Sequence, residues 1–365
     1  MIKGINIFKV SAIITFIFFV KFSVFSNLNL DLLIGFVFGI LPFYYFIKKE
    51  GHRLPMTTII ILICVLVAYP ISIAMNSFTS GYFTLPMVIS SFGIAYVFKS
   101  DERLYKLVKI VLILVLVNFL FQVIFLGQTG NEVYVGSRNR KSVIFLGIAI
   151  FFIILNPHKR QNIIVAFFVL VSSILSVGSA GIIASIFLFL FTFFESFKYY
   201  NKFVITAIIS SFIFGVTYLY FTVLNNIPDD EILFKLSYER LFSEDIRYEI
   251  WAEYYKTYMK GWHLVFGAPF DFQLSANFQG NYVDFNNLHS SYFTLHAKTG
   301  LLSIVILLAI LWRFKKIFSV KPYYAGLLFI ILLRSYSDTS FILEGSLNFA
   351  FFIFFLPNSL LFKDI

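Results

Sequence analysis

The sequence predicts an all-α polytopic integral membrane protein with about twelve transmembrane helices and one large external loop. Of its 365 residues, 59% are hydrophobic and only 13% are charged. An ordinary soluble domain has about 45–50% hydrophobic and about 25% charged residues. Apolar runs of the length that a bilayer crossing needs, about 20 residues, recur along nearly the whole chain. Runs such as 110–126 are apolar on every face, which excludes the alternating pattern of an outer-membrane barrel.

The order of the apolar runs defines the expected organisation. The first run is a retained helix and not a signal peptide, because it lacks a small-residue cleavage site and another span follows at once. Gly178 and Gly181 separate two short spans, since one helix over 162–194 would be about 50 Å long. Nine spans over 1–224 are followed by an external loop with amphipathic helices over 225–289 and three spans over 290–365. The expected spans are 5–25, 30–47, 56–75, 82–98, 104–126, 142–155, 162–177, 180–194, 203–224, 290–312, 322–335 and 345–362.

The lysines and arginines predict that both termini are cytoplasmic. Six segments that would then lie inside are cation-rich, whereas the short outside connections near residues 27, 77 and 179 contain no cation. This topology accounts for the net charge of +10 without nucleic-acid binding. The single cysteine, Cys64, allows no disulfide within the chain.

One outer connection departs from this charge pattern. The loop from Gly127 to Lys141 ends in three cations, Arg138, Arg140 and Lys141. Cations are disfavoured on the outer side of a membrane protein. The loop is therefore either an ordinary solvated segment or an anion site.

The external loop is acidic overall. Between Asn225 and Asn287 it holds ten acidic and five basic residues. Anion binding there must rest on individually placed arginines, which bind phosphate oxygens in a bidentate manner. A helix ending near Lys260 would place Tyr254 on one face, with Arg247 and Trp251 on the neighbouring face. Its aromatic rings either lie at the membrane surface or, for Trp251, stack on sugar rings.

His289 stands where the chain re-enters the membrane after this loop. A lone histidine is usually structural, but one at an outer boundary can act as a general base near neutral pH. His296, on the same helix face, is better explained by packing or a buried hydrogen bond. Arg334 ends the apolar run 327–333 on the outer side, where it either pairs with Asp338 or faces the cavity.

These features together resemble the O-antigen polymerase and O-antigen ligase family of bacterial membrane glycosyltransferases. The resemblance rests on the basic outer loop, on Arg247-x-x-x-Trp251 followed by Gly261 or Gly267, and on His289 with Gly300 beyond it. Its motifs cover 136–142 and 240–302. The family commonly has His-Asn at His289-Ser290, and often Ser-Arg-Gly where this chain has Ser179-Ala180-Gly181.

The resemblance implies transfer of a glycan from a polyprenyl diphosphate to a sugar hydroxyl, at the external face of the bacterial inner membrane. It assigns catalysis to His289 and Arg247. No metal or other cofactor is implied. The implied partners are the lipid-linked oligosaccharide and membrane lipid, with a chain-length regulator protein as a further candidate. The substrate-binding candidates are Arg138, Arg140, Lys141, Arg240, Trp251 and Arg334, where Arg138 or Arg140 would replace the arginine missing at Ala180.

Three alternatives stay open. A polymerase is favoured over a ligase because the chain is compact, although the acceptor is not encoded in any motif. A flippase or transporter would place ionisable residues near the bilayer midplane and show two related halves, neither of which the sequence has. A non-catalytic scaffold has no positive feature in its favour.

Overall fold

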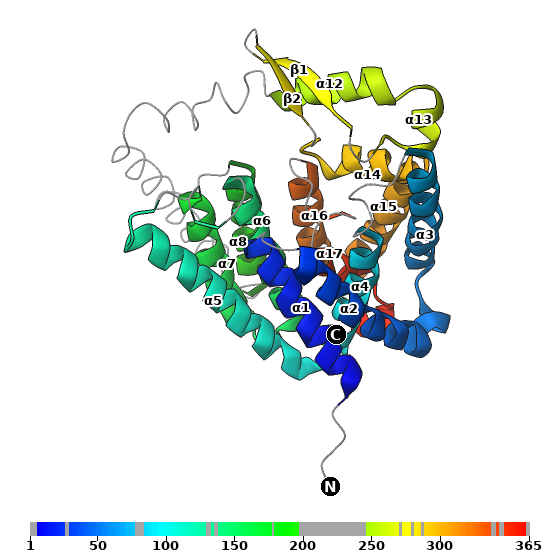
Figure 1. The fold of residues 1–365 in the computed structure, drawn as a ribbon. Helices are drawn as coiled ribbons and strands as arrows, with labels where there is room; N and C mark the ends of the chain where they lie inside the picture. Colours follow the sequence, from blue (N-terminus) through cyan, green and yellow to red (C-terminus); the bar gives the residue numbers. More distant parts are fainter. Residues whose placement is uncertain are drawn as a thin grey trace.

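The structure is a computed structural model and is predominantly helical (Figure 1). It describes residues 6–25, 29–76, 84–128, 133–134, 138–176, 179–196, 246–269, 272–278, 281–285, 288–336, 341–342 and 347–362. The predicted span 203–224 and the first part of the external loop lie outside the described residues.

The N-terminal helices agree closely with the predicted spans. Each corresponds to one predicted apolar run, and their ends differ from the predicted ends by a few residues. The helices are α1 (Ile7–Phe25), α2 (Asn29–Glu50), α3 (Met56–Asn76), α4 (Thr84–Ser100), α5 (Tyr105–Ile124), α6 (Arg138–Leu155), α7 (Lys159–Leu175) and α8 (Ser179–Ser196), with short 3-10 turns η1 (Gly51–Arg53) and η3 (Glu102–Leu104).

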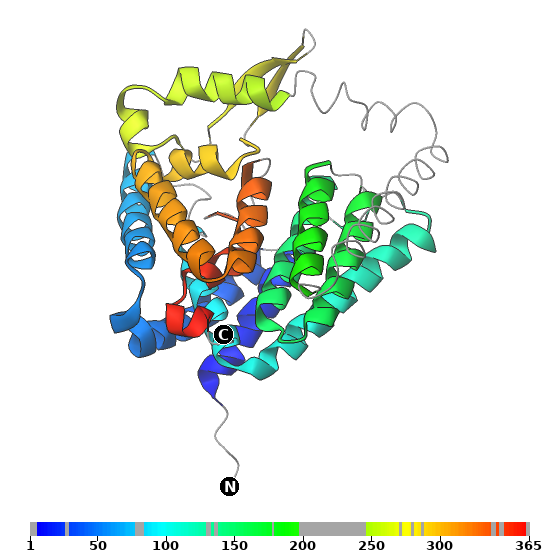
Figure 2. The same cartoon turned by 180° about the vertical axis from the view of Figure 1, so that it is seen from behind.

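The C-terminal part contains a surface layer and further helices of the bundle. The layer consists of α12 (Ile246–Tyr258), α13 (Gly261–Phe266), β1 (Leu274–Phe278) and β2 (Asn281–Phe285). Figures 1 and 2 show it lying across one end of the bundle, above α14 (Ser291–Thr299), α15 (Leu302–Val320) and α16 (Pro322–Tyr336). The chain then forms α17 (Phe349–Phe352), the 3-10 turn η4 (Ile353–Phe355) and α18 (Asn358–Leu361).

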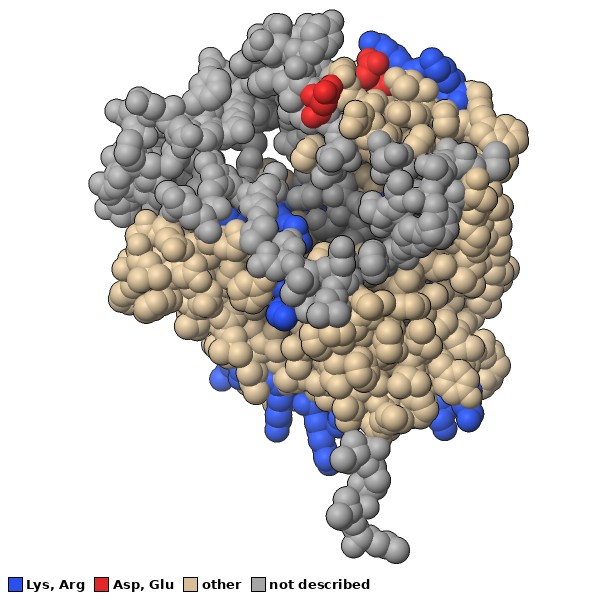
Figure 3. All heavy atoms as spheres, viewed as in Figure 1, with Lys and Arg blue, Asp and Glu red and all other residues tan. Residues whose placement is uncertain are grey.

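The surface of the bundle is apolar over a broad band. Figure 3 shows Lys and Arg side chains gathered at the end opposite the layer, with few charged atoms between. By length and composition, two helices among the described residues are able to cross a membrane, Ile7–Phe25 and Glu102–Ile124. Shorter apolar helices cover Met56–Ala68, Leu85–Ser100 and Ala180–Ser196. On α5, Leu114 is 63% exposed although it is apolar, while Leu112 on the opposite side is buried.

Phenylalanine rings and small residues hold the bundle together. The ring of Phe16 on α1 lies 5.0 Å from Phe98 on α4 and 5.3 Å from Phe349 on α17. Gly93 on α4 packs so closely on α2 that a Cβ would overlap the backbone at Phe43. Small residues allow this approach of two helix backbones in apolar surroundings.

The prediction of one helix over 290–312 is wrong. The chain breaks between α14 and α15 at Gly300, whose φ is +54°. A Cβ there would overlap the Val265 carbonyl, and the Leu301 N–H donates a 3.1 Å hydrogen bond to that same oxygen. The end of α13 therefore fits into the break, which only glycine permits.

The prediction of one helix over 345–362 is also wrong. This segment forms the short elements α17, η4 and α18, which leaves carbonyl groups without helical partners. Arg313 on α15 binds them, since its Nε and Nη2 donate to the Phe354 and Leu356 carbonyls at 2.6 and 2.7 Å. A third bond joins its Nη1 to Asn358 Oδ1 at 2.6 Å. A buried guanidinium thus replaces the missing helical hydrogen bonds.

The segment predicted to be an external loop contains a β-hairpin, which the sequence did not predict. Strands β1 and β2 pair antiparallel, with Leu274 opposite Phe285 and Phe278 opposite Asn281. Two residues, one of them glycine, separate the strands in the sequence, as is common in hairpins.

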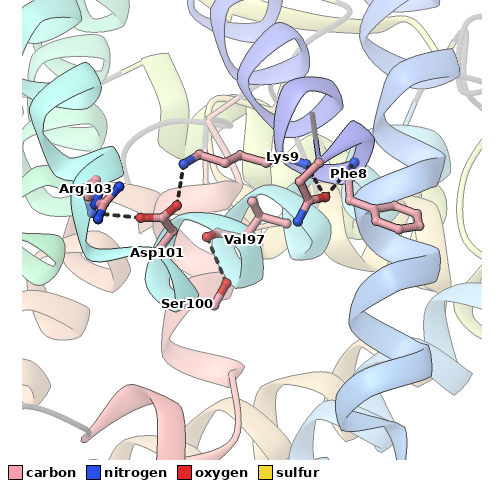
Figure 4. A network of polar contacts seen from close by, with 7 residues as sticks. Phe8, Lys9, Val97, Ser100, Asp101 and Arg103 are labelled. Carbon is pink, nitrogen blue, oxygen red and sulfur yellow. Dashed lines mark hydrogen bonds and ion pairs between the residues drawn. The ribbon is translucent and has the colours of Figure 1, made fainter. Parts of the chain in front are cut away.

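A polar network joins α1 to the turn between α4 and α5, at the end of the bundle opposite the layer (Figure 4). The Lys9 ammonium forms an ion pair with the Asp101 carboxylate. The backbone N–H of Arg103 donates a 3.0 Å hydrogen bond to Asp101 Oδ1. Burial raises the pKa of Asp101, but these hydrogen bonds and the charges of Lys9 and Arg103 outweigh it and lower the pKa.

Candidate functional site

The layer has a small hydrophobic core of its own. Ile250 and Tyr254 on one face of α12 are fully buried, and they pack with Ala268, Leu274 and Leu288. The predicted face of α12 is therefore its inner face, which α13, the hairpin and α14 cover. This packing determines how α12 lies over the segment that carries His289.

Trp251 connects α12 to that segment. Its indole Nε1–H donates a 2.7 Å hydrogen bond to the carbonyl of Leu288, the residue before His289. The ring stacks on Phe293 of α14 at 5.3 Å and meets Tyr336 of α16 edge-on at 5.3 Å. With only 8% exposure, it has little free surface for a sugar, so these contacts favour a positioning role for Trp251 over sugar stacking.

His289 itself has an unusual backbone. It is half-buried, and its φ of +49° lies in the left-handed region. This region is uncommon for residues other than glycine, and strained residues cluster at functional sites. The bond from Trp251 to Leu288 stabilises the backbone at this point.

His296 lies within a hydrogen-bonded bridge. Its Nδ1 lies 2.9 Å from the Tyr254 hydroxyl, and its Nε2 lies 3.2 Å from the Leu264 carbonyl. If Nε2 carries the proton that is donated to Leu264, Nδ1 accepts from Tyr254. Burial raises the pKa of Tyr254 far above its usual value, which keeps its hydroxyl a donor. His296 thus joins α12, α13 and α14, in agreement with the expected buried hydrogen bond.

Two cations are buried where α6, α8 and α16 meet. Lys141 in the first turn of α6 is 0% exposed, and Arg334 in the last turn of α16 is 1% exposed. The Arg334 Nη2 donates a 3.5 Å hydrogen bond to the Ser142 hydroxyl. Gly181 on α8 packs against the same Ser142, because a Cβ there would overlap its side chain.

Three helices begin around the end of α16. Helix α6 begins at Arg138, one turn before the Ser142 that Arg334 contacts, and α8 begins at Ser179, two residues before the Gly181 that packs on Ser142. Helix α14 begins at Ser291, and its Tyr292 hydroxyl donates a 2.8 Å hydrogen bond to the Leu332 carbonyl on α16. Helix N-termini carry partial positive charge and free N–H groups. Together with Lys141 and Arg334, they form a region suited to a phosphate group.

The predicted residues are only partly brought together. Lys141 and Arg334 are the two buried cations near the N-terminus of α6, which we call the cation region, and Arg140 is in the same turn of α6 as Lys141. Trp251 contacts Tyr336, two residues beyond Arg334, and thereby links the His289 segment to the end of α16. The side chains of Arg138 and Arg247 lie outside the described residues, although Arg138 begins α6 and Arg247 is the second residue of α12. Arg240 lies outside the described residues altogether, as does Asp338.

Sequence reasoning assigned no role to Ser142 or Tyr292, and it placed Tyr254 on a helix face without predicting its hydrogen bond to His296. Ser142 directly follows the cations of the outer loop, and this adjacency was the only available signal for it. The hydroxyls of Tyr254 and Tyr292 bond to groups 42 and 40 residues away in the sequence. Local patterns do not report such contacts.

Metal ligands do not gather in the described part of the chain. No three His, Cys, Asp or Glu side chains there form a group that could hold a metal ion.

Comparisons with known proteins identify no relative. No family model, no curated protein and no solved structure matches the chain.

Proposed function

We propose that this chain is a polytopic protein of the bacterial inner membrane that polymerises lipid-linked oligosaccharide repeat units. Both termini would be cytoplasmic, and the layer of α12, α13 and the hairpin would lie on the external face. The substrate would be a glycan on a polyprenyl diphosphate, and the acceptor a sugar hydroxyl on a second lipid-linked unit.

The observation that carries the proposal is the meeting of Lys141, Ser142 and Arg334 at the N-terminus of α6. Two cations buried with three helix N-termini around them suit a doubly charged diphosphate. These charges would stabilise a leaving group whose negative charge grows in the transition state.

The transfer step forms one bond and breaks another. The acceptor hydroxyl oxygen attacks the anomeric carbon of the donor glycan, and the bond from that carbon to the phosphate oxygen breaks. The diphosphate leaves with the electron pair, and His289 takes the hydroxyl proton as a general base. Proton transfer of this kind contributes about 10²–10⁴-fold to the rate.

Two other functions predict different products. An O-antigen ligase would transfer the same glycan to a lipid A core and would not lengthen the lipid-linked chain. A flippase would move the lipid-linked glycan across the bilayer without forming a glycosidic bond. The buried cations at one end of the bundle favour a fixed leaving-group site over a transport path, because transporters bind their substrates near the midplane.

The direct test incubates the purified protein with lipid-linked repeat units. Polymerase activity would give chains of two or more repeats, with one polyprenyl diphosphate released for each bond formed. Transfer only to added lipid A core would replace the proposal with the ligase. Translocation in proteoliposomes without any chain growth would replace it with the flippase.

A further inference from the structure

An exposed apolar face runs along α15. Between Leu301 and Trp312 the exposed residues recur at helical spacing on one side of the helix, and all of them are apolar. They are Leu301, Ile304, Val305, Leu308, Leu311 and Trp312, each 40–61% exposed. Exposed Lys315 and Lys316 follow. Tryptophan and lysines at the end of an apolar face are typical of a membrane–water boundary.

This face is too short to cross a bilayer by itself. A helix rises about 1.5 Å per residue, so Leu301 and Trp312 lie about 16 Å apart along the axis. The hydrocarbon core of a bilayer is about 30 Å thick. Because α15 begins at Leu302, after the break at Gly300, another element must continue the face beyond Leu301.

Helix α13 lies at this end of α15. Figures 1 and 2 show it between α12 and the ends of α15 and α3. The Leu301 N–H donates a 3.1 Å hydrogen bond to the Val265 carbonyl of α13. Val265 is 41% exposed, and Trp262, one turn earlier, is 56% exposed. The apolar face therefore continues onto α13 and ends there at a second tryptophan.

The surface becomes polar beyond α13. On α12, Glu253 and Lys256 form an ion pair at 3.8 Å, and their side chains are 38% and 72% exposed. The apolar face thus has a tryptophan at each end and charged residues beyond each tryptophan. This order matches the layers of a lipid bilayer, in which aromatic side chains lie at both boundaries of the hydrocarbon core. A protein partner does not require it.

Helix α13 is also bonded to the helix that follows His289. The Ala268 N–H donates a 2.9 Å hydrogen bond to the Ala297 carbonyl of α14. The Leu264 carbonyl lies 3.2 Å from His296 Nε2. Since α14 begins two residues after His289, the depth of α13 in a membrane determines the depth of that segment.

We propose that α13 is a lipid anchor. Trp262 and Val265 lie in the leaflet on the side of the layer, and their contact with phospholipid holds the His289 segment at the level of the head groups. The inference goes beyond the proposed function and requires only that the bundle crosses a membrane. Trp262→Phe preserves the contact, because phenylalanine keeps an aromatic ring at this level.

The test measures the depth of spin labels on the full-length protein in phospholipid nanodiscs. Cys64 is the only cysteine, so Cys64→Ser provides a background for single labels at Val265→Cys, Leu308→Cys and Tyr255→Cys. Tyr255, on α12, is 64% exposed and is the aqueous reference. The label collides with oxygen in lipid and with a nickel chelate in water. We expect the ratio of these two collision rates to be about tenfold higher at position 265 than at position 255, because apolar molecules concentrate in hydrocarbon and polar ones are excluded.

Two results would overturn the lipid anchor. A ratio at position 265 equal to that at position 255 would place α13 in water. A label at position 265 that neither reagent reaches, together with dipolar broadening between labels, would show a second copy of the chain on this face.

A second arm tests the link between α13 and the break at Gly300. In the Val265→Cys protein, Gly300→Ala should raise the collision rate with the nickel chelate about twofold, because the added Cβ overlaps the Val265 carbonyl and displaces α13. Gly127→Ala is the matched control. Gly127 also has a positive φ, +65°, but a Cβ there meets no atom within 4 Å. Equal collision rates in the two variants would refute the link.

The collision rates are measured without substrate, so they do not depend on catalysis. A lipid-exposed label at position 265 without chain growth from repeat units would refute the polymerase and retain the anchor. Chain growth with a water-exposed label at position 265 would refute the anchor alone.

Discussion

The indole of Trp251 donates a 2.7 Å hydrogen bond to the carbonyl of Leu288, the residue that precedes His289. This bond joins helix α12 of the layer to the point where the chain enters α14. It also connects two of the sequence elements on which the family resemblance rests, Arg247-x-x-x-Trp251 and His289. The position of His289 therefore depends on a residue that makes no contact with substrate in our account.

Trp251→Phe should lower polymer formation without preventing folding. Phenylalanine keeps the stacking on Phe293 but loses the donor to Leu288, a bond with a net contribution of about 0.5–1.5 kcal/mol. We expect about a tenfold slower rate, because small displacements of a catalytic group are costly. Trp262→Phe is the control, since Trp262 is 56% exposed and contacts Phe266 within α13. Equal rates in both variants would exclude a positioning role for Trp251.

Arg247→Lys should reduce activity about 10–100-fold, the loss expected when hydrogen bonds to a charged group disappear. Lysine keeps the charge but lacks the bidentate fork that matches phosphate. The rate of chain growth is measured with the protein shown to be inserted normally. Lys260→Gln, in the turn between α12 and α13, should have no effect. A wild-type rate for Arg247→Lys would remove this residue from the site.

Arg334 and Arg313 should respond differently to the same substitution. Arg334→Gln should abolish polymer formation and preserve folding, because its role in our account is to bind the diphosphate. Arg313→Gln should lower the melting temperature, because it leaves three oxygen acceptors short of a donor, at about 1–3 kcal/mol for each buried group. Thermal unfolding and chain growth are measured for both variants. Polymer formation by the Arg334→Gln protein would contradict the proposal that Arg334 binds the diphosphate.

Asp101 should confer a pH-dependent stability on the end of the bundle opposite the layer. The pKa of Asp101 is lowered in the folded state. Its carboxylate therefore contributes fully to the free energy of unfolding above the unfolded pKa of about 3.9, and this contribution is lost as the pH falls through the folded pKa. Asp101→Asn should cost at most about 1 kcal/mol at pH 7, since the pair with Lys9 is partly exposed. The difference from the wild type should fade below about pH 4. A stability difference that stays constant between about pH 7 and about pH 4 would contradict the role of the Lys9–Asp101 pair. A difference that Lys9→Met does not reproduce would also contradict it.

The amphipathic and apolar patterns predicted the helices well where one apolar run forms one element. The runs 56–75 and 322–335 correspond to α3 and α16. The same patterns did not predict the break at Gly300 or the irregular segment 353–357. A break inside an apolar run does not change the composition of the run, so the composition does not report it. Distant groups supply the missing hydrogen bonds: the Val265 carbonyl at the Gly300 break and Arg313 in the segment 353–357.

The sequence predicted which residues belong to the candidate site better than it predicted the contacts between them. The cations Lys141 and Arg334 were singled out separately, one from the outer loop and one from the end of an apolar run. That Arg334 reaches Ser142, 192 residues earlier in the chain, follows from the packing of α6 on α16. The role of Trp251 changed for the same reason, because burial against Phe293 and Tyr336 is a property of the tertiary fold.

The most direct test compares the wild type and His289→Gln in the chain-growth reaction with purified lipid-linked repeat units. Glutamine keeps hydrogen bonding but is not basic at neutral pH. We predict a ladder of polymer from the wild type, and from His289→Gln a rate lower by about 10²–10⁴-fold with substrate binding retained. His296→Gln, which changes the bridge to Tyr254, should keep most of the activity. No ladder from the wild type, or equal ladders from the wild type and His289→Gln, would contradict the account.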